Sequence, residues 1–332
     1  MLLYLEMRRQ AKKFETKRYQ MNRYRTYWNF VAERIEDMLS INDIQIRDPF
    51  VLTVPEEGCY YLYGTTDKDP WGVHAQGFQA YKSSDLKIWE GPYPVFSPPA
   101  DFWADRNFWA PEVHRYRGAY YMPASFKSAE HRRAVHILWS QSPLGPFLPL
   151  SREPVTPAGW ECLDGTLYLD DTDSPWLIFS HEWTQIHDGA MCCMRLTEDL
   201  KSGCSLPAVM FRASRSGWSM NDTGDVIQGG GENYVTDGPY IMRQKDGGLL
   251  LLWSSYSVTG YSIGTAYSSS GKITGPWRHA PKPFFAADGG HGMVFYTLDG
   301  RMMLAVHQPN KTPFERARFI PVQVLEQDLK LG

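Results

Sequence analysis

Five short segments of the chain carry residues whose types could perform chemistry together. They contain Asp48 in "IRDPF", Trp109 in "NFWAPEVH", Asp164 in "CLDGTLY", Asp237 in "VTDGPYI" and His291 in "GGHGMVF". An isolated aspartate before glycine or proline is ordinarily a turn residue. Three aspartates at corresponding places in similar segments indicate more than turns. Three carboxylates in one site could supply a general base, a general acid and a third group that tunes the acid.

The residues from 41 onward form the elements that must position these side chains. Short apolar runs alternate there with turns rich in glycine, proline, aspartate and serine, which is typical of an all-β protein. A weak repeat of roughly 45 to 60 residues has the length of a four-stranded propeller blade. Repeats that start near 46, 109, 163, 237 and 291 leave room for five blades. We predict a five-bladed β-propeller over 41–332, with the five segments converging at one end of its central channel.

The segment "NDIQIRDPFVLTV", residues 42–54, shows how such a residue is placed. Apolar residues alternate on both sides of Asp48, as they do in a strand. Pro49 cannot donate to a sheet ladder, so the strand must begin, end or bend there. We therefore expect Asp48 where the first inner strand enters the channel.

Residues 1–40 differ from the rest of the chain. No glycine or proline occurs between positions 7 and 39, and arginine, lysine and glutamate are frequent. We predict a helical extension that docks on the main domain or on a second subunit, which would make a homo-oligomer. Its basic residues are interpreted as a solvated helix face, since no RNA-recognition motif accompanies them.

The composition limits the partners and the compartment. With 34 basic and 37 acidic side chains, the net charge of -3 gives no reason to expect nucleic acid or an anionic membrane. No apolar run reaches 18 residues, so no membrane span is predicted. Five cysteines without metal-like spacing favour a reduced chain. The apolar run in the segment "MLLYLEMRRQ" is too short for a signal peptide, and Glu6 interrupts it. This predicts a cytoplasmic protein, or a secreted or periplasmic one if a leader was removed.

The order RDP, WAPE, LDG, DGPY and GGHG resembles glycoside hydrolase family 43, a family of five-bladed β-propeller enzymes. The resemblance covers about residues 41–325. Each motif is weak alone, whereas five in the right order are specific. The sequence from 236 to 293 is similar to the branch with arabinofuranosidase-, galactofuranosidase- and xylosidase-like members.

The resemblance implies three acidic roles. Asp48 matches the general base that activates water, and Asp164 matches the carboxylate that raises the pKa of the acid and orients it. Asp237 stands where the family usually has the glutamate of an EGP motif, so the proton donor would be one methylene shorter here. Glu232, in "GGGENYVTDGP", is a rival donor, but the motif register favours Asp237. Inverting glycosidases use such an acid and base about 6.5 to 9.5 Å apart.

The resemblance also implies a role for His291, whose family counterpart helps to hold a metal ion, often calcium, directly or through water. A hydrogen-bonded core histidine is the alternative, because no cluster of oxygen ligands accompanies it. We expect no required cofactor, and any calcium or other cation in the channel would be structural.

Several further residues are candidates for sugar contacts. Trp109 is the expected stacking platform, and the additional candidates are Trp103, Phe108, His181, Glu182, Trp183 and Arg212.

These residues together predict an inverting, exo-acting glycoside hydrolase on plant-type oligo- or polysaccharides. It would release terminal α-L-arabinofuranosyl units, or β-D-xylosyl or β-D-galactofuranosyl units. A non-catalytic carbohydrate-binding propeller is one alternative, because fold does not guarantee activity. A retaining hydrolase of the fructan and sucrose type is another, although the "NDPN" signature of its first blade is absent.

Overall fold

The computed structural model describes residues 38–72, 74–221 and 232–332. Residues 1–37 of the predicted helical extension lie outside the described residues. Met38–Ser40, which the prediction placed in the same extension, form strand β1 instead. Residues 40–332 make up one compact unit. The predicted boundary between residues 40 and 41 otherwise stays a prediction.

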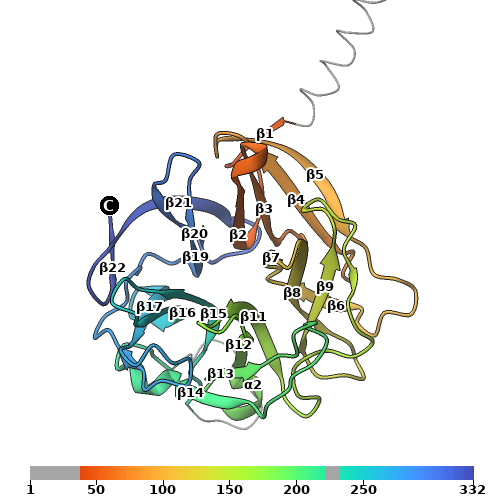
Figure 1. Ribbon diagram of the computed structural model, residues 1–332. Coiled ribbons are helices and arrows are strands. Elements are labelled where there is room, and N and C mark those ends of the chain that lie inside the picture. Colours follow the sequence, from red (N-terminus) through yellow and green to blue (C-terminus); the bar gives the residue numbers. More distant parts are fainter. Residues whose placement is uncertain (1–37, 73, 222–231) are drawn as a thin grey trace, which may run out of the picture. The chain divides into compact units, whose positions relative to one another are not determined.

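Five antiparallel sheets surround a common axis, which confirms the predicted five-bladed propeller (Figure 1). From the axis outward, the first sheet runs β2-β3-β4-β5, with β1 at its edge. In the second sheet both β6 and β7 pair with β8, which is followed by β9 and β10. The other three sheets run β11 to β14, β15 to β18 and β19 to β22.

The strands are mostly short, as expected for propeller blades. Their bounds in chain order are β1 (Met38–Ser40), β2 (Arg47–Val54), β3 (Cys59–Thr65), β4 (Phe78–Ser83), β5 (Ile88–Phe96), β6 (Arg106–Trp109), β7 (His114–Tyr116), β8 (Ala119–Lys127), β9 (Ala134–Ser140), β10 (Leu148–Pro149), β11 (Cys162–Leu169), β12 (Pro175–His181), β13 (Ala190–Arg195), β14 (Ala208–Arg212), β15 (Asp237–Arg243), β16 (Leu249–Ser257), β17 (Gly260–Ser268), β18 (Arg278–His279), β19 (Gly290–Tyr296), β20 (Met302–Gln308), β21 (Arg316–Val324) and β22 (Leu329–Leu331). The helical turns are η1 (Pro55–Glu57), α2 (Trp183–Ile186) and η2 (Ala213–Ser216). None of the helices in the described ranges is long and apolar enough to cross a membrane.

The hydrophobic core lies between neighbouring blades. Along β16, Leu249 and Leu251 pack against the third blade, while Leu250 and Leu252 pack against the fifth. This alternation follows from the opposite directions of successive side chains in a strand. The adjacent, free cysteines 192 and 193 likewise contribute to two different inter-blade layers. A propeller strand is therefore apolar on both faces.

Each inner strand bends at an equivalent residue with a left-handed backbone. The φ angles at these five residues are 51° at Asp48, 47° at Ala110, 55° at Asp164, 50° at Gly238 and 48° at His291. Strand pairing shifts by one residue across four of these positions. In the second blade, Trp109 pairs with Ser125 and the Glu112 N–H donates to Pro123 O, which produces the same shift. Such bulges re-aim the side chains at a strand end.

This register corrects one prediction. Asp48, Asp164 and His291 do share one structural position. Trp109 and Asp237 were placed at that position too, but they lie one residue earlier, because the bent residues of their blades are Ala110 and Gly238. The motifs "WAP" and "DGP" therefore align with "RDP" by their proline.

A ring of polar contacts ties each blade to the next one at this end of the channel. In every blade, the second strand places a polar side chain opposite the residue before the bulge, and this side chain reaches the following inner strand. Thr65 Oγ1 accepts from Ala110 N at 2.9 Å, Ser125 Oγ from Asp164 N at 2.8 Å, Ser254 Oγ from His291 N at 2.8 Å and His307 Nδ1 from Asp48 N at 3.1 Å, while Ser180 Oγ donates to Thr236 O. The contact from His307 to Asp48 closes the ring between the fifth and first blades.

Candidate active site

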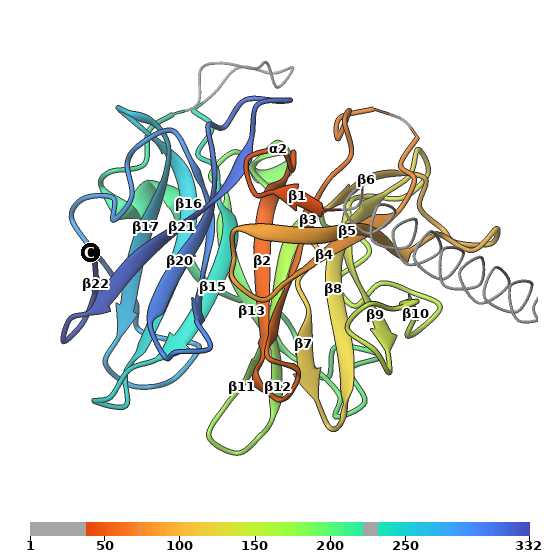
Figure 2. The ribbon, with the colours of Figure 1, turned by 90° about the horizontal axis from the view of Figure 1, so that it is seen from above.

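A cavity of about 420 Å³, called the axial pocket below, opens where the inner strands begin. Figure 2 shows α2 at the end of the propeller where β2 begins. The lining residues come from all five blades and their loops: Arg47, Asp48, Thr65, Pro70, Trp71, Trp109, Leu163, Asp164, Glu182, Trp183, Val235, Asp237, Tyr256, Tyr261, His291 and Asn310. The three predicted carboxylates therefore share one cavity, although they are far apart in the chain.

The surroundings of Asp48 hold its carboxylate in the charged form. Thr65 Oγ1 donates to Asp48 Oδ2 at 2.8 Å, and His291 Nδ1 lies 3.2 Å from Oδ1. Burial alone would raise the pKa of Asp48, but the charges of His291 and Arg47 outweigh burial and bring the pKa below its usual range. A charged carboxylate of this kind can accept a proton from water.

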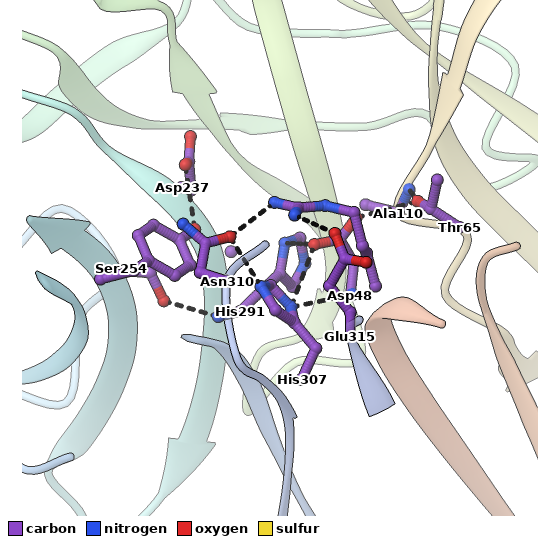
Figure 3. A network of polar contacts seen from close by, with 12 residues as sticks. Asp48, Thr65, Ala110, Asp237, Ser254, His291, His307, Asn310 and Glu315 are labelled. Atoms are coloured by element: carbon purple, nitrogen blue, oxygen red, sulfur yellow. Dashed lines mark hydrogen bonds and ion pairs between the residues drawn. The ribbon is translucent and has the colours of Figure 1, made fainter. Parts of the chain in front are cut away.

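A buried network connects Asp48 to the last blade (Figure 3). Burial lowers the pKa of His307 to about 3, so its ring is neutral at pH 7. Its Nδ1 accepts from the Asp48 N–H, and its Nε2 donates to Asn310 Oδ1 at 3.1 Å, which assigns the tautomer from the hydrogen bonds. Arg47 donates to Asn310 Oδ1 at 2.8 Å and pairs with fully buried Glu315 at 2.7 Å. The position of Asp48 thus depends on residues of the fifth blade.

His291 lies between two of the carboxylates. Its Nδ1 is 3.2 Å from Asp48 Oδ1 and 3.5 Å from Asp164 Oδ2. Burial opposes its charge, but the two aspartates raise the pKa of His291 to about 10. Gly238 makes room for this ring, because a Cβ there would come within 2.7 Å of the imidazole. His291 is therefore an imidazolium within the group of carboxylates.

The pKa values of Asp164 and Asp237 are raised, whereas that of Asp48 is lowered. Burial raises the pKa of Asp164 to about 6; the His291 charge opposes the shift and Asp48 adds to it. Burial and the Asp164 charge raise the pKa of Asp237 to about 8, although a 2.9 Å hydrogen bond from Tyr261 to Asp237 Oδ2 opposes the shift. At pH 7 the pocket therefore contains a carboxylate at Asp48 and a carboxylic acid at Asp237, the pairing that acid–base catalysis needs.

Asp237 and its rival Glu232 lie in different places. Asp237 lines the axial pocket, whereas Glu232 is exposed, does not line it, and accepts a 3.1 Å hydrogen bond from the hydroxyl of Tyr234. Tyr261 can approach Asp237 because residue 290 is glycine, where a Cβ would meet the tyrosine ring at 2.2 Å. The geometry favours Asp237 as the group that meets a substrate.

Three of the predicted sugar contacts line the axial pocket, namely Trp109, Glu182 and Trp183. The carboxylate of Glu182 is paired with the buried guanidinium of Arg133 at 2.6 Å. The same guanidinium lies 4.0 Å from the centre of the Trp109 ring. Arg133 therefore holds both side chains in place from behind.

The other four predicted contacts lie outside the axial pocket. Trp103 donates to His136 Nδ1 at 3.1 Å, and Phe108 is buried in a cluster of phenylalanines that includes Phe126. His181 stacks on Trp160 with ring centres 4.1 Å apart. Exposed Arg212 donates to the carbonyl of Asp188 at 2.9 Å.

Sequence reasoning missed several pocket residues. Arg47 stood beside Asp48 without an assigned role, and Trp71, Tyr256, Tyr261 and Asn310 were not singled out. Arg47 directly precedes Asp48 in the sequence, which is a usable signal. Trp71 and Asn310 lie in loops, and Tyr256 and Tyr261 lie in the second and third strands of the fourth blade. No local pattern distinguishes them there from turn residues or core aromatics.

The residues around His291 do not fit a metal site. In the portions of the chain that the structure describes, no group of three or more histidine, cysteine or acidic side chains could hold a metal ion. A structural cation in the channel stays a prediction.

A propeller whose axial pocket contains a charged carboxylate, a protonated carboxyl group and aromatic walls has the features of a carbohydrate-cleaving enzyme. Residues 41–323 match the model of glycosyl hydrolases family 43, and the chain belongs to this family. Membership confirms the predicted resemblance, and the chain is a glycosidase.

Solved structures and curated proteins provide relatives. An endo-arabinase from Bacteroides thetaiotaomicron VPI-5482 is 39% identical with a TM-score of 0.79, over 87% of this chain and 98% of that chain. Extracellular endo-alpha-(1->5)-L-arabinanase 1 of Bacillus subtilis (strain 168) is 22% identical over 254 residues, which are 70% of this chain and 67% of that protein. An exo-1,5-alpha-L-arabinanase from a bovine ruminal metagenomic library shares the fold at 17% identity and a TM-score of 0.64, over 87% of this chain and 96% of that chain.

Proposed function

We propose that this glycosidase hydrolyses α-L-arabinofuranosyl linkages in plant-type oligo- or polysaccharides, with inversion at the anomeric carbon. The sugar is supported by the arabinose-polymer names of the relatives at 39% and 22% identity. The mechanism is supported by one observation above all, the opposite pKa perturbations of Asp48 and Asp237 within one pocket.

In the proposed reaction, the Asp48 carboxylate removes a proton from a water molecule as the water oxygen attacks the anomeric carbon. The glycosidic bond breaks, and its oxygen takes the proton of Asp237. Asp164 keeps Asp237 protonated by charge repulsion and accepts a 3.0 Å hydrogen bond from Gly238 N–H, which orients the strand that carries the acid. After product release, proton exchange with solvent returns both groups to their starting states.

The proposal has two versions, which differ in whether the enzyme cleaves terminal or internal linkages. Release of terminal units is the prediction made from the sequence. Internal cleavage is favoured by the name of the relative at 39% identity, an endo-arabinase. The products from linear arabinan distinguish the two, since an exo enzyme releases one short product from the outset and an endo enzyme releases a ladder of oligosaccharides.

The test is turnover of linear arabinan and of 4-nitrophenyl α-L-arabinofuranoside, β-D-xyloside and β-D-galactofuranoside. The variants are Asp48→Asn, Asp237→Asn and the matched control Glu232→Gln, which removes an exposed carboxylate outside the axial pocket. We expect the first two to reduce kcat by about 100-fold or more, and the control to retain activity. Proton NMR of the first product should show the inverted anomer.

Other outcomes would replace the proposal. Retention of configuration would indicate the fructan and sucrose type of mechanism. Sugar binding without turnover would indicate a carbohydrate-binding propeller. Loss of activity only in Glu232→Gln would show that Glu232 is the donor. Turnover of the xyloside or galactofuranoside alone would keep the mechanism and change the sugar.

A further inference from the structure

Trp71 is unusual among the residues of the axial pocket. Of the sixteen described residues that line the pocket, it alone is exposed, with 59% of its surface accessible. Asp48, Asp164 and Asp237, where the bond would break, are buried or partly buried. Trp71 therefore lies at the outer rim of the cavity, and its indole contributes little to the hydrophobic core.

The protein nevertheless holds this exposed indole in a defined position. The carbonyl of the preceding residue, Pro70, accepts hydrogen bonds from Trp109 Nε1 at 2.6 Å and from Asn107 Nδ2 at 3.2 Å. The Trp71 ring contacts Trp109 edge to face, with centres 5.0 Å apart and planes at 72°. These contacts tie a loop of the first blade to the inner strand of the second.

A guanidinium also contacts Trp71. Arg47 lies 5.3 Å from the centre of the Trp71 ring, within the range of a cation–π contact. Arg47 is itself held by Glu315 at 2.7 Å and by Asn310 at 2.8 Å. Arg133 contacts the ring of Trp109 in a similar way. Two tryptophans at a steep angle are thus fixed between two anchored arginines.

A contiguous apolar surface beside a cavity marks a ligand-binding groove, and Trp71 and Trp109 form such a surface at the axial pocket. The apolar C–H face of a sugar ring matches the flat face of an indole in size and polarity. Trp109, which lines the same pocket and is partly buried, would serve the sugar whose bond is cleaved. A sugar on Trp71 would be the next unit outward along the chain.

We propose that Trp71 is the stacking platform for the sugar unit adjacent to the one that is cleaved, so that the site binds at least two linked units. This inference rests on the proposed function for the identity of the sugar, but not for the existence of the platform. In this role, Trp71 would determine the preference of the enzyme for oligosaccharides over glycosides that contain a single sugar unit.

The experiment compares two substrates that differ at this position. α-L-Arabinofuranosyl fluoride has a single-atom leaving group and cannot reach Trp71, whereas α-1,5-linked arabinotriose can. Trp71→Ala should lower kcat/KM for arabinotriose by about 10-fold and leave the fluoride within about twofold. Trp71→Phe, which keeps a ring, should restore most of the loss. Tyr296→Ala, an aromatic residue with 55% exposure outside the axial pocket, is the matched control.

Two outcomes would overturn the platform. An equal loss on both substrates would place Trp71 against the cleaved sugar, and no loss on either would show that Trp71 does not meet the substrate. If the wild type cleaves only xylosides or galactofuranosides, the proposed sugar is wrong, and the same comparison is made with those sugars. If nothing is cleaved, binding of the arabinofuranosyl, xylosyl and galactofuranosyl trisaccharides is followed by tryptophan fluorescence. No binding, or binding that Trp71→Ala leaves unchanged, would refute the platform independently of catalysis.

Discussion

Removal of the Tyr261 hydroxyl should raise the pH at which the enzyme loses activity. Asp237 donates a proton in the proposed mechanism, so it works only while protonated. Its pKa is raised to about 8, and kcat/KM of the wild type should therefore fall as the pH rises through about 8. Tyr261 donates to Asp237 Oδ2 at 2.9 Å and so stabilises the charged form. Without that donor, protonated Asp237 should persist to higher pH.

The size of the shift follows from the hydrogen bond. A hydrogen bond to a charged group contributes about 1.5 to 3 kcal/mol. One pKa unit corresponds to about 1.4 kcal/mol, which gives an upper limit of roughly two units. Asp237 is only partly buried, so water can replace part of the lost donor. We expect the alkaline limb of kcat/KM to move up by about one unit in Tyr261→Phe.

The assay is kcat/KM between pH 4 and 11 on linear arabinan or on whichever glycoside the wild type cleaves. Asp164→Asn should move the same limb to lower pH, because it removes the neighbouring charge that raises the pKa of Asp237. Tyr63→Phe is the control, since its buried hydroxyl donates to Pro143 O and does not line the axial pocket. An alkaline limb that stays in place or moves down in Tyr261→Phe would refute the assignment of Asp237 as the acid.

Three further perturbations test the fold and the pocket. Glu315→Gln should lower the free energy of unfolding by about 3 kcal/mol in urea titration, because it leaves Arg47 without its buried charged partner. An unchanged midpoint would mean that this ion pair does not hold the fifth blade to the first. Leu251→Ala should cost about 2 to 5 kcal/mol in the same assay, since this side chain is fully buried between the third and fourth blades, while kcat of the folded fraction stays within about twofold. Exhaustive treatment with EDTA should leave kcat within about twofold, because His291 supplies the positive charge between the carboxylates; a loss that calcium restores would contradict this role.

The strand starts and the order of the motifs were predictable from the sequence. Proline or glycine after the bent residue marks the bulge of each inner strand, as in "RDP", "LDG" and "GHG". Local chemistry determines these positions, because only a few residue types tolerate a left-handed backbone or a missing ladder donor. The five-bladed fold and the family therefore followed from local patterns repeated along the chain.

Some predicted sugar contacts are sequence neighbours of pocket residues but lie outside the axial pocket themselves. Phe108 and Trp109 are neighbours, as are His181 and Glu182, yet one of each pair lines the axial pocket and the other does not. Successive residues of a regular strand point to opposite sides, whereas a bulge brings adjacent residues such as Leu163 and Asp164 to the same cavity. Without the strand register, no rule selects the correct member of each pair.

By itself, the sequence determined which residue types stand at the bends of the inner strands or directly before them, and hence that three carboxylates and a histidine would converge. Only the tertiary structure decided the protonation of each carboxylate. Asp48, Asp164 and Asp237 are the same residue type, and their pKa values diverge because His291, Arg47 and Tyr261 approach them from other parts of the chain. Protonation depends on burial and on the charges within a few ångströms. The closing of the ring from the fifth blade to the first sets those distances.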